Sequence, residues 1–185
     1  MKKLKILELT NFSAGICGVW TRVKEEARRL SKLGYEVRIF SSNAIKCITQ
    51  LSCENENIGN VKLKRFSFQK LGGESFMNWN FEEEALKFSP DIIICHSYRH
   101  LHTTKALKIA EKLKKQRKKC KVLLVTHAPF KRMSSRNFLQ NLSVNFYDLF
   151  VGKPSINKFD KVIAITKWEI SYLKKLNFIF PEGSI

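Results

Sequence analysis

The sequence predicts an α/β fold in which a single doubly wound domain has a mainly parallel sheet with helices on both faces. Strand-like and helix-like segments alternate along the 185 residues, an order typical of parallel strands joined by crossover helices. Continuous apolar runs such as DIIIC and KVLLV are typical of strands buried on both faces. No internal repeat or low-complexity linker divides the chain, whose length suits one domain with a substantial core.

The first half of the chain opens with a strand, a helix and a second strand. Leu4–Leu9 is a short apolar run, and from Val19 apolar residues recur at helical spacing until Gly34 ends the helix. The second strand is expected at Glu36–Phe40, and a long loop or weak extra element follows at Ser42–Asn60. A strand is expected at Val61–Phe68, a turn at residues 70–75 and a short helix at Phe81–Phe88.

The second half continues the same alternation. Pro90 ends the preceding helix, because proline lacks the amide hydrogen that a helix interior needs. Strands and helices are then expected in turn at Ile92–Cys95, Thr103–Lys118, Lys121–Thr126, Ser134–Phe150, Lys161–Ile165 and Lys167–Leu176. The apolar residues of the second of these helices fall on one face, at Phe138, Leu142, Phe146 and Leu149. The whole pattern indicates a Rossmann-like domain.

The composition is strongly basic, with a formal net charge of +18. Such a charge favours an anionic partner, namely nucleic acid, a lipid headgroup or a phosphorylated substrate. A lysine-rich solvated surface, as heat-loving organisms use, explains the charge equally well, because lysines recur along most of the chain.

The cysteines and the apolar runs indicate a cytoplasmic protein. The chain has 5 cysteines and no C-x-x-C pair, which fits free thiols in a reducing compartment better than a disulfide framework. The apolar run after the basic start is too short for a signal peptide, and no stretch approaches the roughly 18 apolar residues of a membrane span. We therefore expect a cytoplasmic location, peripheral at most at the inner face of the membrane.

Polar and ionisable residues gather where the expected strands end. Ligands of open α/β sheets bind beyond the carboxyl ends of the strands, and the sequences at those ends are Asn11–Gly18, His96–His102, His127–Ser135 and Thr166–Lys167. This gathering is the main indication of a site.

The first of these stretches holds Gly15 and Gly18, spaced as G-x-x-G. Glycine allows a close approach of backbone to ligand, and the helix that follows presents free amides to an anion. The G-x-G-x-x-G of dinucleotide sites and the G-x-x-x-x-G-K-[ST] of a P-loop are both missing. The loop therefore either binds a phosphate or simply turns the chain into the helix.

Histidines supply the other candidates. His96, His100 and His102 lie within seven residues, yet their spacing suits a metal only if the segment were helical, and no carboxylate is near them in sequence. We expect no metal and local hydrogen bonds for these rings. His127 follows a buried strand, where it would either bond a substrate hydroxyl or developing charge, or cap the strand end.

Several segments, in order, resemble one family. CGVWTRVKEEARRLSKLGYEVRIFSS, PDIIICHS, VTHAPF, FDKVIAITKWEISYLKKLNF and FIFPEGSI are similar to the successive motifs of the retaining, nucleotide-sugar-dependent glycosyltransferases of the GT-B fold, the glycogen-synthase-like group of glycosyltransferase family four. The resemblance covers nearly the whole chain. No single motif is specific, and the ordered set is fairly specific. Cys17 departs from the pattern, since the family has glycine there.

The resemblance implies an N-terminal, acceptor-binding domain at 1–180, the start of an interdomain linker at 181–185, and a donor-binding domain that this chain lacks. The implied donor-phosphate loop comprises Gly15, Cys17 and Gly18, and the implied catalytic residue is His127. The implied acceptor-binding residues are Asn11, His96, Lys131 and Arg132. The co-substrate would be a nucleotide-diphosphate sugar, with no cofactor and no metal.

The expected function is therefore that of the N-terminal half of a hexosyltransferase that transfers a sugar to a lipid-linked or anionic acceptor, inactive by itself. The basic stretches Lys112–Lys121 and Lys131–Arg136 would dock on anionic lipid. The alternatives are a basic module that binds nucleic acid or another polyanion, and a small nucleotide-binding enzyme complete in itself. The basic runs lack interleaved aromatic residues, which argues against nucleic acid.

Overall fold

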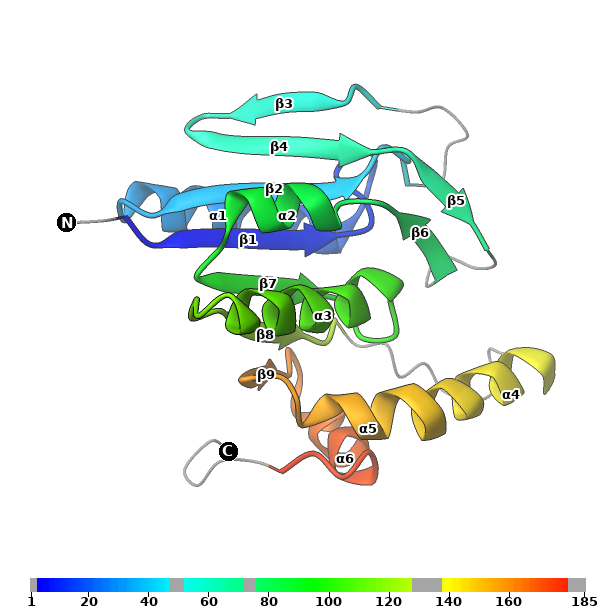
Figure 1. Cartoon of the computed structure of the whole chain (residues 1–185). Helices are drawn as coiled ribbons and strands as arrows, with labels where there is room; N and C mark the ends of the chain where they lie inside the picture. Colours follow the sequence, from blue (N-terminus) through cyan, green and yellow to red (C-terminus); the bar gives the residue numbers. More distant parts are fainter. Residues whose placement is uncertain (1–2, 47–51, 72–75, 128–137, 180–185) are drawn as a thin grey trace.

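A computed structural model describes residues 3–46, 52–71, 76–127 and 138–179, with the side chains of 138–140 left out. Its main sheet has seven strands in the order β3-β4-β2-β1-β7-β8-β9, drawn in Figure 1. The strands, in that order, are Asn55–Ile58, Val61–Phe66, Glu36–Ser42, Lys5–Thr10, Ile92–His96, Lys121–Val125 and Lys161–Ile163. All neighbours pair in parallel except β3 with β4, so the predicted α/β fold is confirmed.

Helices cover both faces of this sheet. Figure 1 shows α1 (Gly18–Lys32) behind it, and α2 (Glu82–Phe88) and α3 (Leu101–Lys115) in front. Side chains alternate between the two faces along each strand. Thus Ile6 packs in the apolar cluster under α1, whereas Leu7 packs in the larger cluster under α2 and α3.

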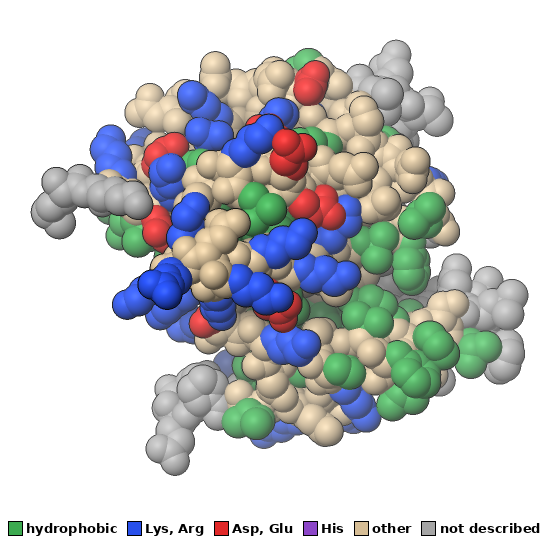
Figure 2. Space-filling model, in the orientation of Figure 1, with side chains coloured by type: hydrophobic (Ala, Val, Ile, Leu, Met, Phe, Trp, Pro, Cys, Tyr) green, Lys and Arg blue, Asp and Glu red, His purple; other side chains and the backbone are tan. Residues whose placement is uncertain are grey.

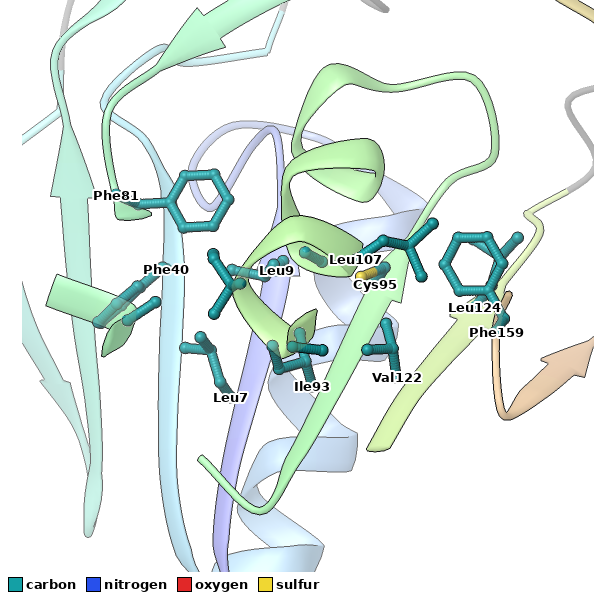
Figure 3. Packing of buried hydrophobic residues seen from close by; sticks show 14 of the residues in the cluster. Leu7, Leu9, Phe40, Phe81, Ile93, Cys95, Leu107, Val122, Leu124 and Phe159 are labelled. Carbon is teal, nitrogen blue, oxygen red and sulfur yellow. The ribbon is translucent and has the colours of Figure 1, made fainter. Parts of the chain in front are cut away.

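The larger cluster forms the main core. Figure 3 shows side chains of β1, β7 and β8 meeting the inner side of α3, with Leu9 and Ile93 near the middle of the cluster and Leu124 beside Phe159. Leu9, Ile93 and Leu124 are all 0% exposed. Burying a side chain of this kind contributes about 1.5–3 kcal/mol, so this layer fixes the strands whose ends form the site.

Helix α1 ends as its sequence predicts. Gly34 has a φ of 92°, a conformation that costs glycine nothing. The amide of Gly34 donates to the carbonyl of Ser31, and that of Tyr35 to the carbonyl of Leu30, which satisfies carbonyls at the helix end.

Several expected elements need correction. The strand expected at Val61–Phe68 divides into β4 and β5 (Phe68–Lys70), and β5 pairs antiparallel with β6 (Met77–Trp79) in a separate hairpin. The sequence did not predict β6, because three residues are too few to show a strand period. Strand β3 lies inside the segment expected to be a loop or weak element. Helix α3 stops at Lys115, because Arg117 adopts a φ of 59°.

The C-terminal part holds a broken helix and a short edge strand. It comprises α4 (Phe138–Tyr147), a π-helical turn at Asp148–Gly152, α5 (Lys153–Ile156), β9 and α6 (Lys167–Lys175). The helix predicted to end at Phe150 thus runs on to Ile156, and the strand predicted to reach Ile165 ends at Ile163. No helix in the described residues has the length and apolar character that a membrane crossing requires.

Candidate functional site at the carboxyl edge of the sheet

The parallel pairing brings the predicted loops to one edge. Leu9 of β1 is opposite Cys95 of β7, and His96 is opposite Val125 of β8. The chain leaving these strands therefore places residues 11–17, 97–100 and 126–127 next to one another. This is the edge at which ligands bind in open α/β sheets.

A row of three side chains runs toward this edge on the α1 face. Glu8 Oε2 lies 2.6 Å from His96 Nε2, and His96 Nδ1 lies 2.9 Å from His127 Nε2. Glu8 and His96 are 0% exposed, whereas His127 is half-buried. The row thus leads from the interior of the sheet to its edge, and both ring nitrogens of His96 are engaged in it.

Burial keeps this row neutral. Loss of hydration raises the pKa of Glu8 to about 8, against a smaller opposite effect of Arg22. Loss of hydration also lowers the pKa of His96 to about 4. It lowers the pKa of His127 to about 3, helped by the nearby His96 and Arg22. Near neutral pH a protonated carboxyl and uncharged rings are therefore favoured.

Glu8, Glu26 and His96 bring ligand atoms within 4.8 Å of one another. Two ligands on one tetrahedral zinc ion lie about 3.3 Å apart, given bonds of about 2.0–2.1 Å. The 2.6 Å contact between Glu8 and His96 is shorter and fits a shared hydrogen. We therefore interpret the pair as hydrogen-bonded partners, and Glu26 as a neighbour that bonds Arg22 at 3.6 Å.

Sequence reasoning missed Glu8. It found no carboxylate near the histidines because His96 and Glu8 are 88 residues apart in the chain, and only the strand pairing joins them. One signal was present: a glutamate inside the apolar run Leu4–Leu9. A buried ionisable residue without a local partner needs a distant one.

A second cluster lies on the opposite face of the sheet. His102 Nδ1 is 2.9 Å from Asn11 Oδ1, and His102 Nε2 is 2.9 Å from the carbonyl oxygen of His96. The indole of Trp79 donates to the same Asn11 oxygen at 3.2 Å. Asn11 is 3% and His102 1% exposed. This cluster links β1, β6 and α3. Asn11 therefore stabilises the fold through its side-chain hydrogen bonds, and its contact with an acceptor stays a prediction.

The two glycines of the first loop differ in what the chain requires of them. Gly15 has a φ of 79°, and a Cβ there would lie 2.9 Å from Ile45 Cγ2 and from the carbonyl oxygen of Lys46. Gly15 is therefore needed to turn the chain. A Cβ on Gly18 would meet nothing within 4 Å, so nothing in the described chain demands glycine at this position.

Cys17 precedes the first turn of α1 without capping it through its side chain. The first amides of that helix have no partner within it. The Cys17 side chain packs partly buried against both apolar clusters. It therefore turns at least partly toward the protein, which leaves the helix end open.

The loop after β7 is held in a strained conformation. Ser97 and Arg99 have φ values of 78° and 68°, and His127 has 53°, a region that costs non-glycine residues energy and is frequent at functional sites. Asp148 in the π-helical turn accepts hydrogen bonds from Tyr98 Oη at 3.1 Å and from Arg99 Nε at 2.8 Å. These bonds hold the loop against the helix.

Glu169 supports the end of β8 from α6. Its Oε2 accepts hydrogen bonds from Thr126 Oγ1 at 2.7 Å and from the amide of Ile165 at 2.8 Å. Glu169 is 0% exposed, and its partner Thr126 precedes His127 in the chain. Sequence reasoning did not select Glu169, which helps to fix the position from which His127 extends.

Two predicted acceptor residues, Lys131 and Arg132, lie outside the described residues. Of the cysteines, Cys17, Cys53, Cys95 and Cys120 are free thiols.

A solved structure supports the fold. The structure titled "Trehalose-6-phosphate from E. coli bound with UDP-2-fluoro glucose" is similar with a TM-score of 0.54 and 12% identity, over 97% of this chain and 44% of that one. The trehalose 6-phosphate synthase of Burkholderia multivorans gives a TM-score of 0.49 and 12% identity, over 100% of this chain and 45% of that one. This chain thus spans less than half the length of either structure. No curated protein matches the sequence.

The sequence profile of Glycosyltransferase Family 4 matches residues 16–183, which is most of the chain and includes the helix start at Gly18, His96 and His127. Together with the doubly wound sheet and the open edge described above, this match shows that the chain belongs to Glycosyltransferase Family 4.

Proposed function

We propose that the chain is the N-terminal, acceptor-binding domain of a retaining, nucleotide-sugar-dependent glycosyltransferase, and that residues 181–185 begin a linker to a donor-binding domain. One observation carries the proposal: in a chain of this family, the open start of α1 and His127 lie at the same edge of the sheet. A phosphate-binding element and a hydrogen-bonding ring are the two groups that sugar transfer needs from this half.

The donor diphosphate is proposed to approach the start of α1. Free amides and the positive end of the helix dipole favour an anion there, and the space at Gly18 allows a close approach. The similar E. coli structure is titled as bound with UDP-2-fluoro glucose, which supports a nucleotide sugar as co-substrate. In this proposal Gly15 shapes the loop, and the partly buried Cys17 leaves room for the phosphate.

His127 is proposed to line the cleft and to hydrogen-bond the sugar or an attacking hydroxyl. A neutral ring suits this role, and burial favours that form by lowering the pKa of His127 to about 3. His96 was predicted to contact the acceptor. Because His96 is fully buried with both ring nitrogens engaged, we propose instead that it acts through His127. Lys131 and Arg132 remain proposed contacts for an anionic acceptor.

The decisive test begins with the coding sequence beyond Ile185. If a second α/β domain follows, the long and the 185-residue proteins are compared for release of nucleoside diphosphate from nucleotide sugars. We expect turnover with retained anomeric configuration, read by NMR, from the long protein alone. Turnover by the short chain would contradict the proposal and favour a complete small enzyme. Tight, steeply salt-dependent binding of DNA or RNA without turnover would favour a polyanion-binding module.

Membrane association is a further part of the proposal. Most of the apolar face predicted along Ser134–Phe150 is exposed: Leu142 and Phe146 of α4 are 56% and 63% exposed, and Leu149 of the π-helical turn is 55% exposed. Phe150 in the same turn, which the prediction did not include, is 59% exposed. Figure 2 shows hydrophobic side chains gathered over this helix, at the lower right. An exposed apolar helix face next to basic residues is suited to the surface of an anionic membrane, and residues 131–136 supply Lys131, Arg132 and Arg136 in the preceding sequence.

The second basic stretch lies elsewhere. Helix α3 begins at the carboxyl edge and runs back along the sheet, so Lys112–Lys121 lies near the amino ends of the strands. One flat membrane would therefore not engage this stretch and the α4 face at the same time, although the sequence analysis expected Lys112–Lys121 to dock on lipid as well as Lys131–Arg136. We expect Phe146→Ser with Phe150→Ser to abolish sedimentation with anionic vesicles at low salt. Lys114→Ser with Lys115→Ser, the control on α3, should retain most of it. Failure of the wild-type chain to bind such vesicles would reject the membrane proposal.

A further inference from the structure

The row formed by Glu8, His96 and His127 has two hydrogen bonds. At its inner end the buried Glu8 Oε1 has no hydrogen-bond partner among the described residues, and its outer end is His127. The contacts of 2.6 Å and 2.9 Å each hold one hydrogen. Among the described residues, the other ring nitrogen of His127, Nδ1, has no hydrogen-bond partner. It therefore forms the end of the row that is available to a ligand.

With both rings uncharged, the hydrogens of the row have only two consistent arrangements. If Glu8 is protonated, it donates to His96 Nε2, His96 Nδ1–H donates to His127 Nε2, and His127 Nδ1 carries a hydrogen. If Glu8 is ionised, each hydrogen bond reverses: His96 Nε2–H donates to Glu8, and His127 Nε2–H donates to His96. His127 Nδ1 is then a bare acceptor.

We propose that Glu8, acting through His96, decides whether His127 offers a hydrogen-bond donor or an acceptor to the substrate. Glu8 and His96 are then positioning residues, and His127 is the residue that touches substrate. The inference deepens the proposed function and rests on it for the identity of the ligand, which is a sugar hydroxyl or the leaving phosphate. The hydrogen-bond geometry itself does not depend on that function.

The row can also carry a proton. When His127 Nδ1 gains one, His127 Nε2 passes its hydrogen to His96 Nδ1, and His96 Nε2 passes its hydrogen to Glu8 Oε2. The net change is a neutral Glu8 with both rings still uncharged. In reverse, a donor at His127 Nδ1 gives up its proton and Glu8 becomes a carboxylate. No other bond forms or breaks.

The surroundings of the row determine which arrangement is present at neutral pH. Glu8 faces His96 on β7 and, from α1, Arg22 and Glu26. Full burial favours the neutral carboxyl, and Arg22 opposes it. Glu26, itself shifted upward mainly by burial, adds a second acid that disfavours a charge on Glu8. Since the pKa of Glu8 is raised to about 8, His127 offers a donor below that pH and an acceptor above it.

The test is a pH titration of the 185-residue chain with ¹⁵N-labelled histidine, followed by two-dimensional NMR of the ring nitrogens. The chain has 4 histidines, which single substitutions assign. We expect His96 and His127 to change together, near pH 8, from the Nδ1–H to the Nε2–H tautomer, with neither ring becoming charged. A His127 that titrates alone to imidazolium near its ordinary pKa, or keeps one tautomer throughout, would overturn the inference.

Variants sharpen the result. Glu8→Gln keeps the shape but cannot ionise, so the joint change should vanish between pH 5 and 10; its persistence would overturn the inference. His96→Asn can still bond His127 but cannot reach Glu8, and it should remove the change in the same way. Glu26→Gln is the matched control, because Glu26 is close but not in the row. It should keep the joint change and move its midpoint to lower pH.

The two proposals fail separately. If Glu8→Gln does not fold, as checked by circular dichroism, the wild-type titration and Glu26→Gln still decide the matter. The NMR experiment needs neither donor nor acceptor. A joint tautomer change in a long protein without sugar transfer would reject the proposed function and retain this inference, whereas transfer without the change would do the opposite.

Discussion

Two hydrogen-bonded clusters that contain histidine lie at the same edge of the sheet, yet they differ in whether every ring nitrogen has a partner within the described residues. His102 is enclosed: one ring nitrogen contacts Asn11, and the other contacts the main chain of His96. The row from Glu8 through His96 to His127 starts at a buried carboxyl and ends at a half-buried ring, whose Nδ1 has no partner in the part of the chain that the structure describes. The first arrangement stabilises the fold, and the second leaves a ring nitrogen that we propose to meet a ligand.

The same distinction separates the two glycines of the first loop. Gly15 is enclosed by Ile45 and Lys46, whereas Gly18 faces open space. A residue type at a strand end is therefore a weak indication of function. Whether its contacts close inside the protein or remain open is a stronger one. Substituting residues whose contacts close inside the protein, and residues whose contacts remain open, tests this distinction.

The largest effect is expected from His127→Ala in the long enzyme. Loss of a hydrogen-bonding ring at the reacting centre should lower kcat by about 10²–10⁴-fold. The melting temperature should fall less than in a variant of a fully buried residue, since the His127 ring is half-buried and the main loss is the hydrogen bond to His96. Steady-state kinetics and thermal melts measure the two quantities. Unchanged turnover would remove His127 from the mechanism.

His102→Ala should have the opposite profile. It empties a fully buried site, removes one hydrogen bond from Asn11 and takes the His102 partner away from the main-chain carbonyl of His96, so the free energy of unfolding should fall by about 2–4 kcal/mol. Urea titration measures this fall. A variant as stable as the wild type, with reduced turnover, would show that His102 belongs with the open group.

The glycines should separate in the same way on a smaller scale. Gly15→Ala forces a left-handed backbone and a clash, and should cost about 1–3 kcal/mol of stability. Gly18→Ala should leave stability unchanged or raise it by up to about 1 kcal/mol, while the long enzyme's KM for donor rises several-fold. Equal losses of stability in both variants would show that the fold needs glycine at Gly18 too, and an unchanged KM for donor in Gly18→Ala would contradict the proposed phosphate approach.

The smallest effect is a dependence of stability on pH. His96 and His127 have lowered pKa values of about 4 and about 3, and burial also lowers that of His102. Unfolding lets these rings bind protons, so stability rises with pH up to about 6.5, the ordinary histidine value. Glu8 has a raised pKa of about 8, so its neutral form stabilises the fold, and this contribution falls as pH rises from about 4.5 through 8.

Below pH 6.5 the three rings outweigh the carboxyl of Glu8, and between pH 6.5 and 8 the change comes mainly from Glu8, with a smaller part from Glu26. Thermal melts should therefore show a maximum near pH 6.5 and a decline toward pH 8. In Glu8→Gln most of the decline should be lost while the acid side remains. A wild-type chain whose stability is flat from pH 6.5 to 9 would show that Glu8 is not neutral in the folded protein.

The sequence by itself determined the fold class, the order of most elements and the edge at which the site lies. Apolar periodicity and helix ends are local, because each depends on residues a few positions apart. The alternation of such segments leaves few architectures that bury every apolar face. The parallel sheet, the end of α1 at Gly34 and the position of His127 after β8 followed from these patterns.

Only the tertiary structure decided which polar atom meets which. The contact of Glu8 with His96 depends on the register of β1 against β7, and the enclosure of Asn11 depends on β6 and α3. The apolar face of α4 could not be identified as exposed from its period, because the same spacing serves a core or an open surface. Register, strand order and the presence of a covering element are set by distant parts of the chain, which local patterns do not contain.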